Sequence, residues 1–204
     1  MLKVAAGAIC GIAAGTVAGI GARSAMRMVA DGVPDPIRQL PSFTVEGTAA
    51  IVIVAALAGA PFGALFGLVY DALPGPRRAR GFLFGIAMLV TVGPLFFTGT
   101  RDEFITYERM ALFSFLFPLF GVAAGLAFEP SLNLAGRLPR AAQAVLALIA
   151  LGGGALVGSG LAAFVVSAVQ THGALAVAYA LPWLAVALVI AALRSRVIPA
   201  RLVR

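Results

Sequence analysis

Five stretches of this sequence carry no charged side chain over a length that can cross a membrane. They are Val4–Ala22, Gly47–Tyr70, Gly81–Thr100, Met110–Phe128 and Ala141–Leu193. The hydrocarbon core of a bilayer is about 30 Å thick, and an α-helix crosses it in roughly 20 residues. Apolar side chains run continuously through these stretches and do not alternate with polar ones, so the pattern predicts helices and not strands.

The last stretch is too long for a single crossing and has to turn back. The only polar cluster inside it consists of Gln170, Thr171 and His172, followed by Gly173. A tight turn there divides the stretch into two helices. The sequence therefore predicts an all-α fold, a polytopic membrane helix bundle forming a single transmembrane domain over residues 1–204, with six transmembrane helices at about 3–30, 47–71, 81–99, 109–129, 141–169 and 174–194.

Composition points to the same class. Apolar residues make up 61% of the chain and charged residues 11%, whereas about 25% of the residues in soluble domains are charged. Cys10 and His172 are the only cysteine and histidine, which excludes a disulfide framework and a multi-histidine metal site. We therefore expect neither a metal nor a cofactor.

Basic residues fall unevenly between the predicted helices. One side of the membrane receives Lys3, Arg77, Arg78, Arg80, Arg137, Arg140, Arg194, Arg196, Arg201 and Arg204. The opposite side receives only Arg23, Arg27, Arg38, Arg101 and Arg109. Short cytoplasmic loops carry the excess of Lys and Arg, so both termini are expected to be cytoplasmic. The net charge of +7 is then a topology signal that favours anionic lipid as a partner and not nucleic acid.

Glycines recur every fourth residue in three of the predicted helices. Residues four apart share one helix face, and such a ridge of small residues lets two helix backbones approach closely in lipid. The spacing predicts helix-packing ridges at Gly7, Gly11, Gly15 and Gly19, at Gly59, Gly63 and Gly67, and at Gly121 and Gly125. These ridges can pack within one chain or between chains.

Two segments resemble each other at an offset of 58 residues. Gly63, Gly67, Leu68, Tyr70 and Asp71 align with Gly121, Gly125, Leu126, Phe128 and Glu129. One interpretation is a duplicated helix hairpin of the kind found in transporters. The other is that glycine and acidic residues fall near helix ends through composition and topology alone. We expect Asp71 and Glu129 to pair at the cytoplasmic ends with Arg77, Arg78, Arg137 or Arg140.

Four prolines lie inside predicted spans, at Pro61, Pro94, Pro118 and Pro182. Each removes a backbone donor and frees a carbonyl that lipid cannot satisfy. The resulting helix breaks either surround a site at mid-depth or are kinks buried in the bundle.

Arg23 and Arg27 are one turn apart and continue the first glycine ridge toward the outer face. Two guanidinium groups there can gather an anion. They can equally contact lipid headgroups or pair with Asp31, Asp35 or Glu46.

No catalytic set is predicted. Ser159 is a candidate nucleophile, but His172 follows thirteen residues later, roughly 20 Å along a helix. The interiors of the later helices carry no charged group of the kind that marks a proton pathway. We therefore expect no enzyme activity.

The stretch GARSAMRM at 21–28, followed by FTVEGT at 43–48, resembles a pattern in uncharacterised small bacterial multi-pass membrane proteins. The resemblance covers the first two predicted helices and implies a setting in the bacterial inner membrane. It implies no activity. The sequence features favour a permease or channel-like subunit for a small solute or ion, and the alternative is a non-catalytic assembly subunit whose glycine ridges dock partner membrane subunits or a second copy of the chain.

Overall fold

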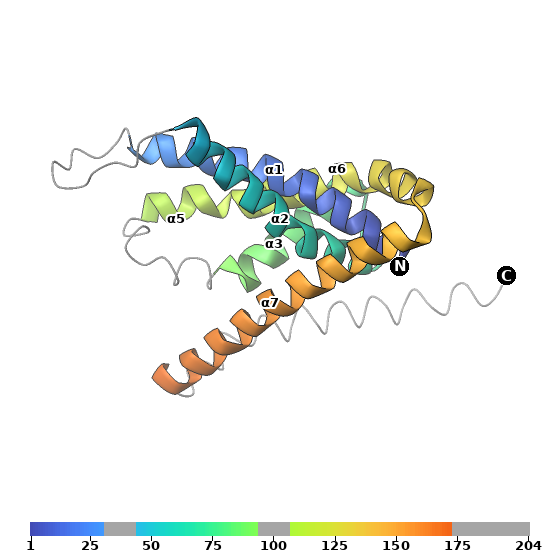
Figure 1. Cartoon of the computed structure of the whole chain (residues 1–204). Helices are drawn as coiled ribbons and strands as arrows, with labels where there is room; N and C mark the ends of the chain where they lie inside the picture. Colours follow the sequence, from blue (N-terminus) through green and yellow to red (C-terminus); the bar gives the residue numbers. More distant parts are fainter. Residues whose placement is uncertain (31–43, 94–106, 173–204) are drawn as a thin grey trace.

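The computed structural model describes residues 1–30, 44–93 and 107–172, and these residues fold into helices without a strand (Figure 1). In chain order the helices are α1 (Leu2–Ala30), α2 (Val45–Val69), α3 (Arg77–Thr91), α5 (Tyr107–Ser114), α6 (Leu116–Arg137) and α7 (Arg140–His172). The all-α prediction is confirmed for this part of the chain. The predicted helix at 174–194 lies outside the described residues.

Three helical segments are long and apolar enough to cross a membrane. They are Leu2–Met28, Val45–Val69 and Met110–Arg137, of which the last combines most of α5 with α6. These segments agree with the first, second and fourth predicted spans. Helix α3 is described only as far as Thr91, so the outer part of the predicted span at 81–99 is not described.

Two predicted helix boundaries are wrong. Helix α3 begins at Arg77, one turn before the expected start, and α6 continues past its predicted end at Glu129 to Arg137. Pro130 lies inside α6 and removes one backbone donor. The helix continues because Phe128, Ser131 and Ala135, spaced on one face, are all buried against the bundle.

Helix α2 begins where the sequence places a capping residue. Thr44 has an extended backbone, and its side-chain oxygen accepts a hydrogen bond from the Gly47 amide at 3.0 Å. This satisfies one of the amides that lack a partner at a helix start. Between α2 and α3 the chain turns at Gly75, which has a φ of 93° that glycine adopts without steric cost.

Helices α2, α6 and α7 pack on α1, and α3 packs on α6. Helices α1, α2, α3 and α6 run side by side, and α7 crosses obliquely over the outside of α1 and α2 (Figure 1). One buried cluster joins α1, α2, α3 and α6. It contains Ala5, Ala6, Cys10, Ala14, Phe66, Tyr70, Phe84, Met88, Phe120, Ala124, Phe128 and Ala135. Helix α1 contributes only small side chains to this cluster, and all of the aromatic rings come from the other helices. The rings therefore pack against the small side chains of α1.

Candidate functional site

The glycine ridges of α1 and α2 face each other within the chain. A methyl group added at Gly11 would lie 2.8 Å from the Cα of Gly63, and one added at Gly59 would lie 3.1 Å from the Cα of Gly15. Distances this short leave no room for a side chain. The two backbones are therefore in direct contact, as expected for small residues at a helix interface in lipid.

Helices α3 and α6 form a second pair of the same kind. A methyl group added at Gly121 would lie 2.8 Å from the Cα of Gly85, and one added at Gly81 would lie 3.0 Å from the Cα of Gly125. The predicted ridge at Gly121 and Gly125 thus packs within the chain too. Its partner residues, Gly81 and Gly85, have the same spacing of four but were not predicted as a ridge.

Each helix pair ends in one ion pair. Lys3 at the start of α1 binds Asp71, which follows α2, and Arg77 at the start of α3 binds Glu129 of α6. Arg77 was one of the arginines expected to pair with Glu129, and this prediction is confirmed. The partner expected for Asp71 is wrong, because the antiparallel packing of α1 on α2 brings Lys3 closer than any arginine of α3.

The two helix pairs therefore share one register. Lys3, Gly7 and Gly11 follow each other at intervals of four, and so do Arg77, Gly81 and Gly85. The acidic partners, Asp71 and Glu129, likewise follow glycines at Gly67 and Gly125 by four residues. The shared spacing of the basic residue and its two glycines can be read from the sequence, but only when α1 and α3 are compared with each other.

Four aromatic rings meet where the two pairs touch. The Phe66 ring centroid lies 5.4 Å from that of Tyr70, 5.0 Å from that of Phe84 and 5.5 Å from that of Phe128. The Tyr70 and Phe128 rings are 4.2 Å apart, and the Arg80 guanidinium lies over the Tyr70 ring at 4.8 Å from its centroid. Such ring pairs and cation–π contacts stabilise packing beyond the area they bury.

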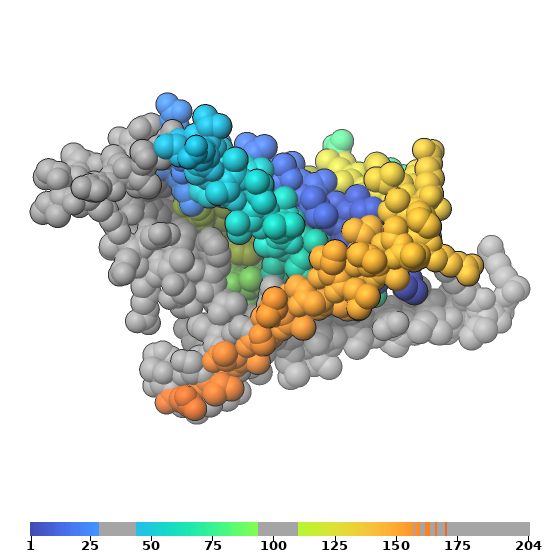
Figure 2. Space-filling model, viewed as in Figure 1, coloured from blue at the N-terminus to red at the C-terminus, as the bar shows by residue number. Residues whose placement is uncertain are grey.

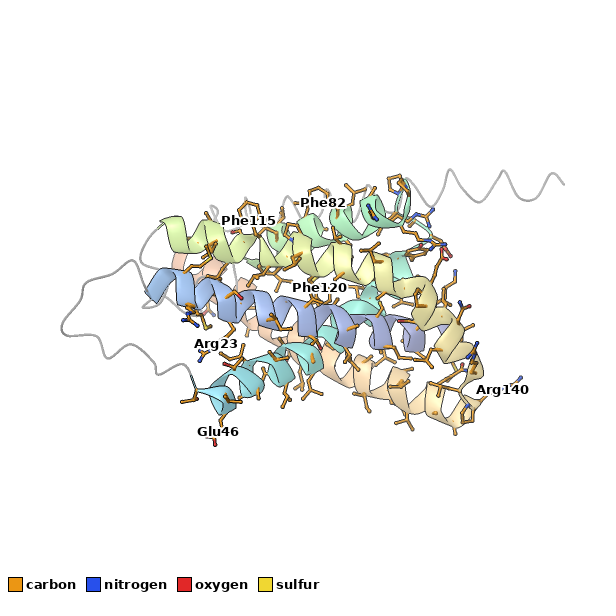
Figure 3. All side chains as sticks on the ribbon, turned by 90° about the horizontal axis from the view of Figure 1, so that it is seen from above. Arg23, Glu46, Phe82, Phe115, Phe120 and Arg140 are labelled. Atoms are coloured by element: carbon orange, nitrogen blue, oxygen red, sulfur yellow. The ribbon has the colours of Figure 1, made fainter. Side chains whose placement is uncertain are left out.

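Arg23 and Arg27 lie at the opposite end of α1 from these ion pairs. Figure 3 shows Arg23 near Glu46 at one end of the bundle and Arg140 at the other. The Arg23 Nε donates a hydrogen bond to the Thr48 hydroxyl at 3.0 Å, so Arg23 links α1 to the first turn of α2. Arg27 is exposed.

An apolar groove of about 460 Å³ lies beside this arginine-bearing end of α1. It opens between α1, α3, α5 and α6, and its lining includes Gly21, Ala25, Met28, Phe82, Phe115 and Leu119. Phe115 and Phe82 point outward in Figure 3 whereas Phe120 points into the bundle. Ser24 also lines the groove, and its hydroxyl donates to the Ile20 carbonyl at 3.0 Å.

Hydroxyl groups within the described helices are bound to their own helices. Thr16, Thr91, Ser114 and Ser159 each donate to a carbonyl three or four residues earlier, at 2.7 to 2.9 Å. Ser131 is the only polar side chain buried in the part of the chain that the structure describes.

The two described prolines of the four predicted helix breaks have different surroundings. Pro61 lies in α2 against α7, where a methyl group added at Gly153 would be 3.2 Å from the Pro61 Cγ. Pro118 lies in α6, with its Cα 2.7 Å from a methyl group added at Gly85. Both side chains are half-buried and lie close to a neighbouring helix. Pro94 and Pro182 lie outside the described residues.

Within residues 1–30, 44–93 and 107–172, no three His, Cys, Asp or Glu side chains come together in a way that could hold a metal ion. Helix α7 runs unbroken from Arg140 through Gly152–Gly154 to His172, so the chain does not fold back between Ser159 and His172. These residues form no catalytic pair in this geometry.

Comparisons of this chain with protein-family models, with curated proteins and with solved structures found no match to any of the three. The class therefore follows from the fold alone. The described part is an all-helical bundle with three helices long and apolar enough to cross a membrane, which is the composition of a membrane protein.

Proposed function

We propose that this protein is a multi-pass permease of the bacterial inner membrane that carries a small amphipathic anion. The observation that supports this proposal is the repetition of one unit, an antiparallel helix pair with backbones in contact through glycine and one ion pair at its end. Many transporters consist of such repeats, which move against each other as rigid bodies. Two stiff pairs joined by side chains provide what this movement requires.

The solute class follows from the groove and its surroundings. Apolar side chains line the groove, and the Ser24 hydroxyl is already bound to its own helix. A hydrophilic solute would lose its hydration there without gaining partners, which costs free energy. An apolar tail loses nothing. Arg27 does not line the groove but is exposed at the same end of α1, and its long side chain offers a guanidinium to an acidic headgroup.

The topology that we propose has six crossings with both termini in the cytoplasm. The described helices support the direction of the first four. Arg77 and Arg140 are the first residues of α3 and α7, and Lys3 is the second residue of α1. Helix α6 ends at Arg137. These basic residues belong to the same end of the bundle, as the positive-inside rule expects. Arg23 and Arg27 then face the periplasm.

The experiment that tests the proposal measures flux of octanesulfonate, an amphipathic anion that remains charged at all usual pH values. The full chain is reconstituted in liposomes, and uptake is compared with octyltrimethylammonium and with sulfate. We expect octanesulfonate alone to enter faster than in protein-free liposomes. Equal uptake with and without the protein would exclude a permease for this class of solute.

Arg27→Gln is the most informative variant. It should lower the initial rate of octanesulfonate uptake about tenfold, because a charge-assisted hydrogen bond contributes roughly 1.5 to 3 kcal/mol. Arg23→Gln is less clean since it also breaks the bond to Thr48. Arg140→Gln, at the other end of the bundle, is the matched control and should leave the rate unchanged.

The second candidate is a non-catalytic assembly subunit. The ridges on α1, α2 and α6 are covered within the chain, so they are not available to a partner helix. Among the described residues, however, nothing lies within 4 Å of a methyl group added at Gly152 or Gly158 of α7. Native mass spectrometry of protein extracted from its own host membrane distinguishes the candidates: stoichiometric foreign subunits would favour assembly, whereas a monomer or homo-oligomer would favour the permease.

A further inference from the structure

Two kinds of helix contact hold the bundle together. Inside each pair, α1 on α2 and α3 on α6, backbone touches backbone with no side chain between. Such contacts cannot adjust by a change of side-chain rotamer. Between the pairs, α1 packs along α6, and there Ala6, Cys10 and Ala14 share one buried cluster with residues of α6. These contacts are made by side chains, and the rings among them can change rotamer as the pairs separate.

The boundary between the pairs, which we call the seam, runs along α1 and α6 and across the rings of α2 and α3. At the end with the two ion pairs, the seam is filled by Phe66, Tyr70, Phe84 and Phe128. These four rings are between 0 and 8% exposed. At the other end the seam is hollow, because the groove of about 460 Å³ lies there between α1 and α6.

We propose that the seam is the moving joint of this protein and that the four rings are the gate that closes it at the end carrying Lys3, Asp71, Arg77 and Glu129. This inference rests on the proposed permease function and names the residues that regulate access to it. Three of the ring contacts cross the seam, and so does the Arg80 guanidinium of α3 over Tyr70. Parting the pairs breaks all of these contacts but leaves both ion pairs and both glycine interfaces intact.

Cys10 provides a reporter for this movement. It is the only cysteine in the sequence, it is fully buried, and it shares one cluster with Phe120, Ala124 and Phe128 of α6. Its neighbours on the same α1 face, Ala6 and Ala14, belong to that cluster too. Opening of the seam therefore exposes the Cys10 thiol to a maleimide reagent.

The experiment compares the rate at which N-ethylmaleimide modifies Cys10 in full-length protein reconstituted in liposomes. Phe128→Ala removes two ring contacts across the seam and should raise the rate about tenfold, since each ring pair stabilises the closed seam. Arg80→Gln removes only the cation over Tyr70 and should raise the rate about threefold. Tyr70→Phe keeps the ring and should react like the wild type. Leu126→Ala, on the same helix as Phe128 but 47% exposed and outside the groove lining, is the matched control and should also react like the wild type.

General loosening of the bundle is detected by a second reporter. Ala64 of α2 is buried in a separate cluster with Ala8, Ala60 and Ala150, on the side that faces α7. In a Cys10→Ala background, Ala64→Cys should react at the same rate with and without Phe128→Ala. Faster modification at both positions would mean partial unfolding and would overturn the gate, as would an unchanged rate at Cys10.

The gate and the permease can fail separately. Faster Cys10 modification without octanesulfonate flux would leave the moving seam in place and refute the proposed solute class. Flux that is unaffected by Phe128→Ala and Arg80→Gln, with Cys10 equally unreactive in all variants, would leave the permease in place and refute this gate.

Discussion

Tyr70 and Phe128 lie tilted against each other between the two helix pairs, at the end of the bundle that carries the ion pairs, with ring centroids 4.2 Å apart and an angle of 32° between the rings. Each ring occupies the same position in its own helix pair, directly before the acidic residue of the ion pair and three residues after a glycine of the ridge. The contact that joins the two pairs is thus made by corresponding residues of both. Because the registers match, the same kinds of contact hold both pairs together, and we expect the two pairs to be similarly stable.

The first prediction concerns the glycine interfaces. Gly11→Ala and Gly121→Ala should each lower the free energy of unfolding by about 1 to 3 kcal/mol, since the added methyl forces two backbones apart. An SDS titration in mixed micelles, followed by circular dichroism, measures the change. Gly136→Ala is the control, because nothing lies within 4 Å of its added methyl, and it should stabilise α6 by about 0.5 to 1 kcal/mol. Equal effects at all three positions would contradict the packing described here.

The second prediction concerns the ion pairs, which should contribute little to stability. The side chains of Lys3 and Asp71 are 50% and 67% exposed, and exposed pairs contribute about 0 to 1 kcal/mol. A double-mutant cycle with Lys3→Gln and Asp71→Asn should therefore give a coupling energy below about 1 kcal/mol. The cycle with Arg77→Gln and Glu129→Gln should agree with it. A coupling of several kcal/mol at either pair would show that its charges are held away from solvent.

The third prediction concerns the docking of α7 on α2, which is seen from outside in Figure 2. Gly153→Leu should displace α7, because even a methyl group there comes within 3.2 Å of Pro61. The measurement is the yield of a disulfide between Ala60→Cys and Ala150→Cys, two residues of one buried cluster, in a Cys10→Ala background. Gly152→Leu, next in the chain but with open space around it, should leave the yield unchanged.

The fourth prediction concerns the start of α2. Thr44→Ala removes the hydrogen bond from the Gly47 amide and should cost about 1 kcal/mol of unfolding free energy, whereas Thr44→Asp should retain most of it. Thr16→Ala is the control, since the Thr16 hydroxyl is bonded only to the carbonyl of Ile12 in its own helix. If Thr16→Ala costs as much as Thr44→Ala, capping is not the cause. The same SDS titration measures all three variants.

Local features of the fold could be predicted from the sequence. Helix α1 was expected at about 3–30 and is observed at Leu2–Ala30, and Thr44, a residue type that favours the N-cap position, caps α2. Both follow from interactions within a few residues of the chain, such as continuous hydropathy and a side chain reaching a nearby amide. The later boundaries were less accurate, because the burial that carries α6 past Pro130 depends on other helices.

The candidate site could be predicted only in part. The spacing of Gly7, Gly11 and Gly15 marks a contact face on α1, but it contains nothing about what covers that face. The ring cluster had no signal of its own apart from the matching positions of Tyr70 and Phe128. Phe66 and Phe84 come from different helix pairs, and no local pattern relates them.

By itself, then, the sequence determined the helical class and the faces on which glycines permit close approach. The tertiary structure decided that α1 meets α2, that α3 meets α6, that Lys3 binds Asp71, and that four rings meet in the seam. The physical reason is that periodicity is a property of one helix, whereas pairing depends on how two surfaces fit. In lipid no hydrophobic force selects the partner, so the choice is made by the shapes of the surfaces that pack.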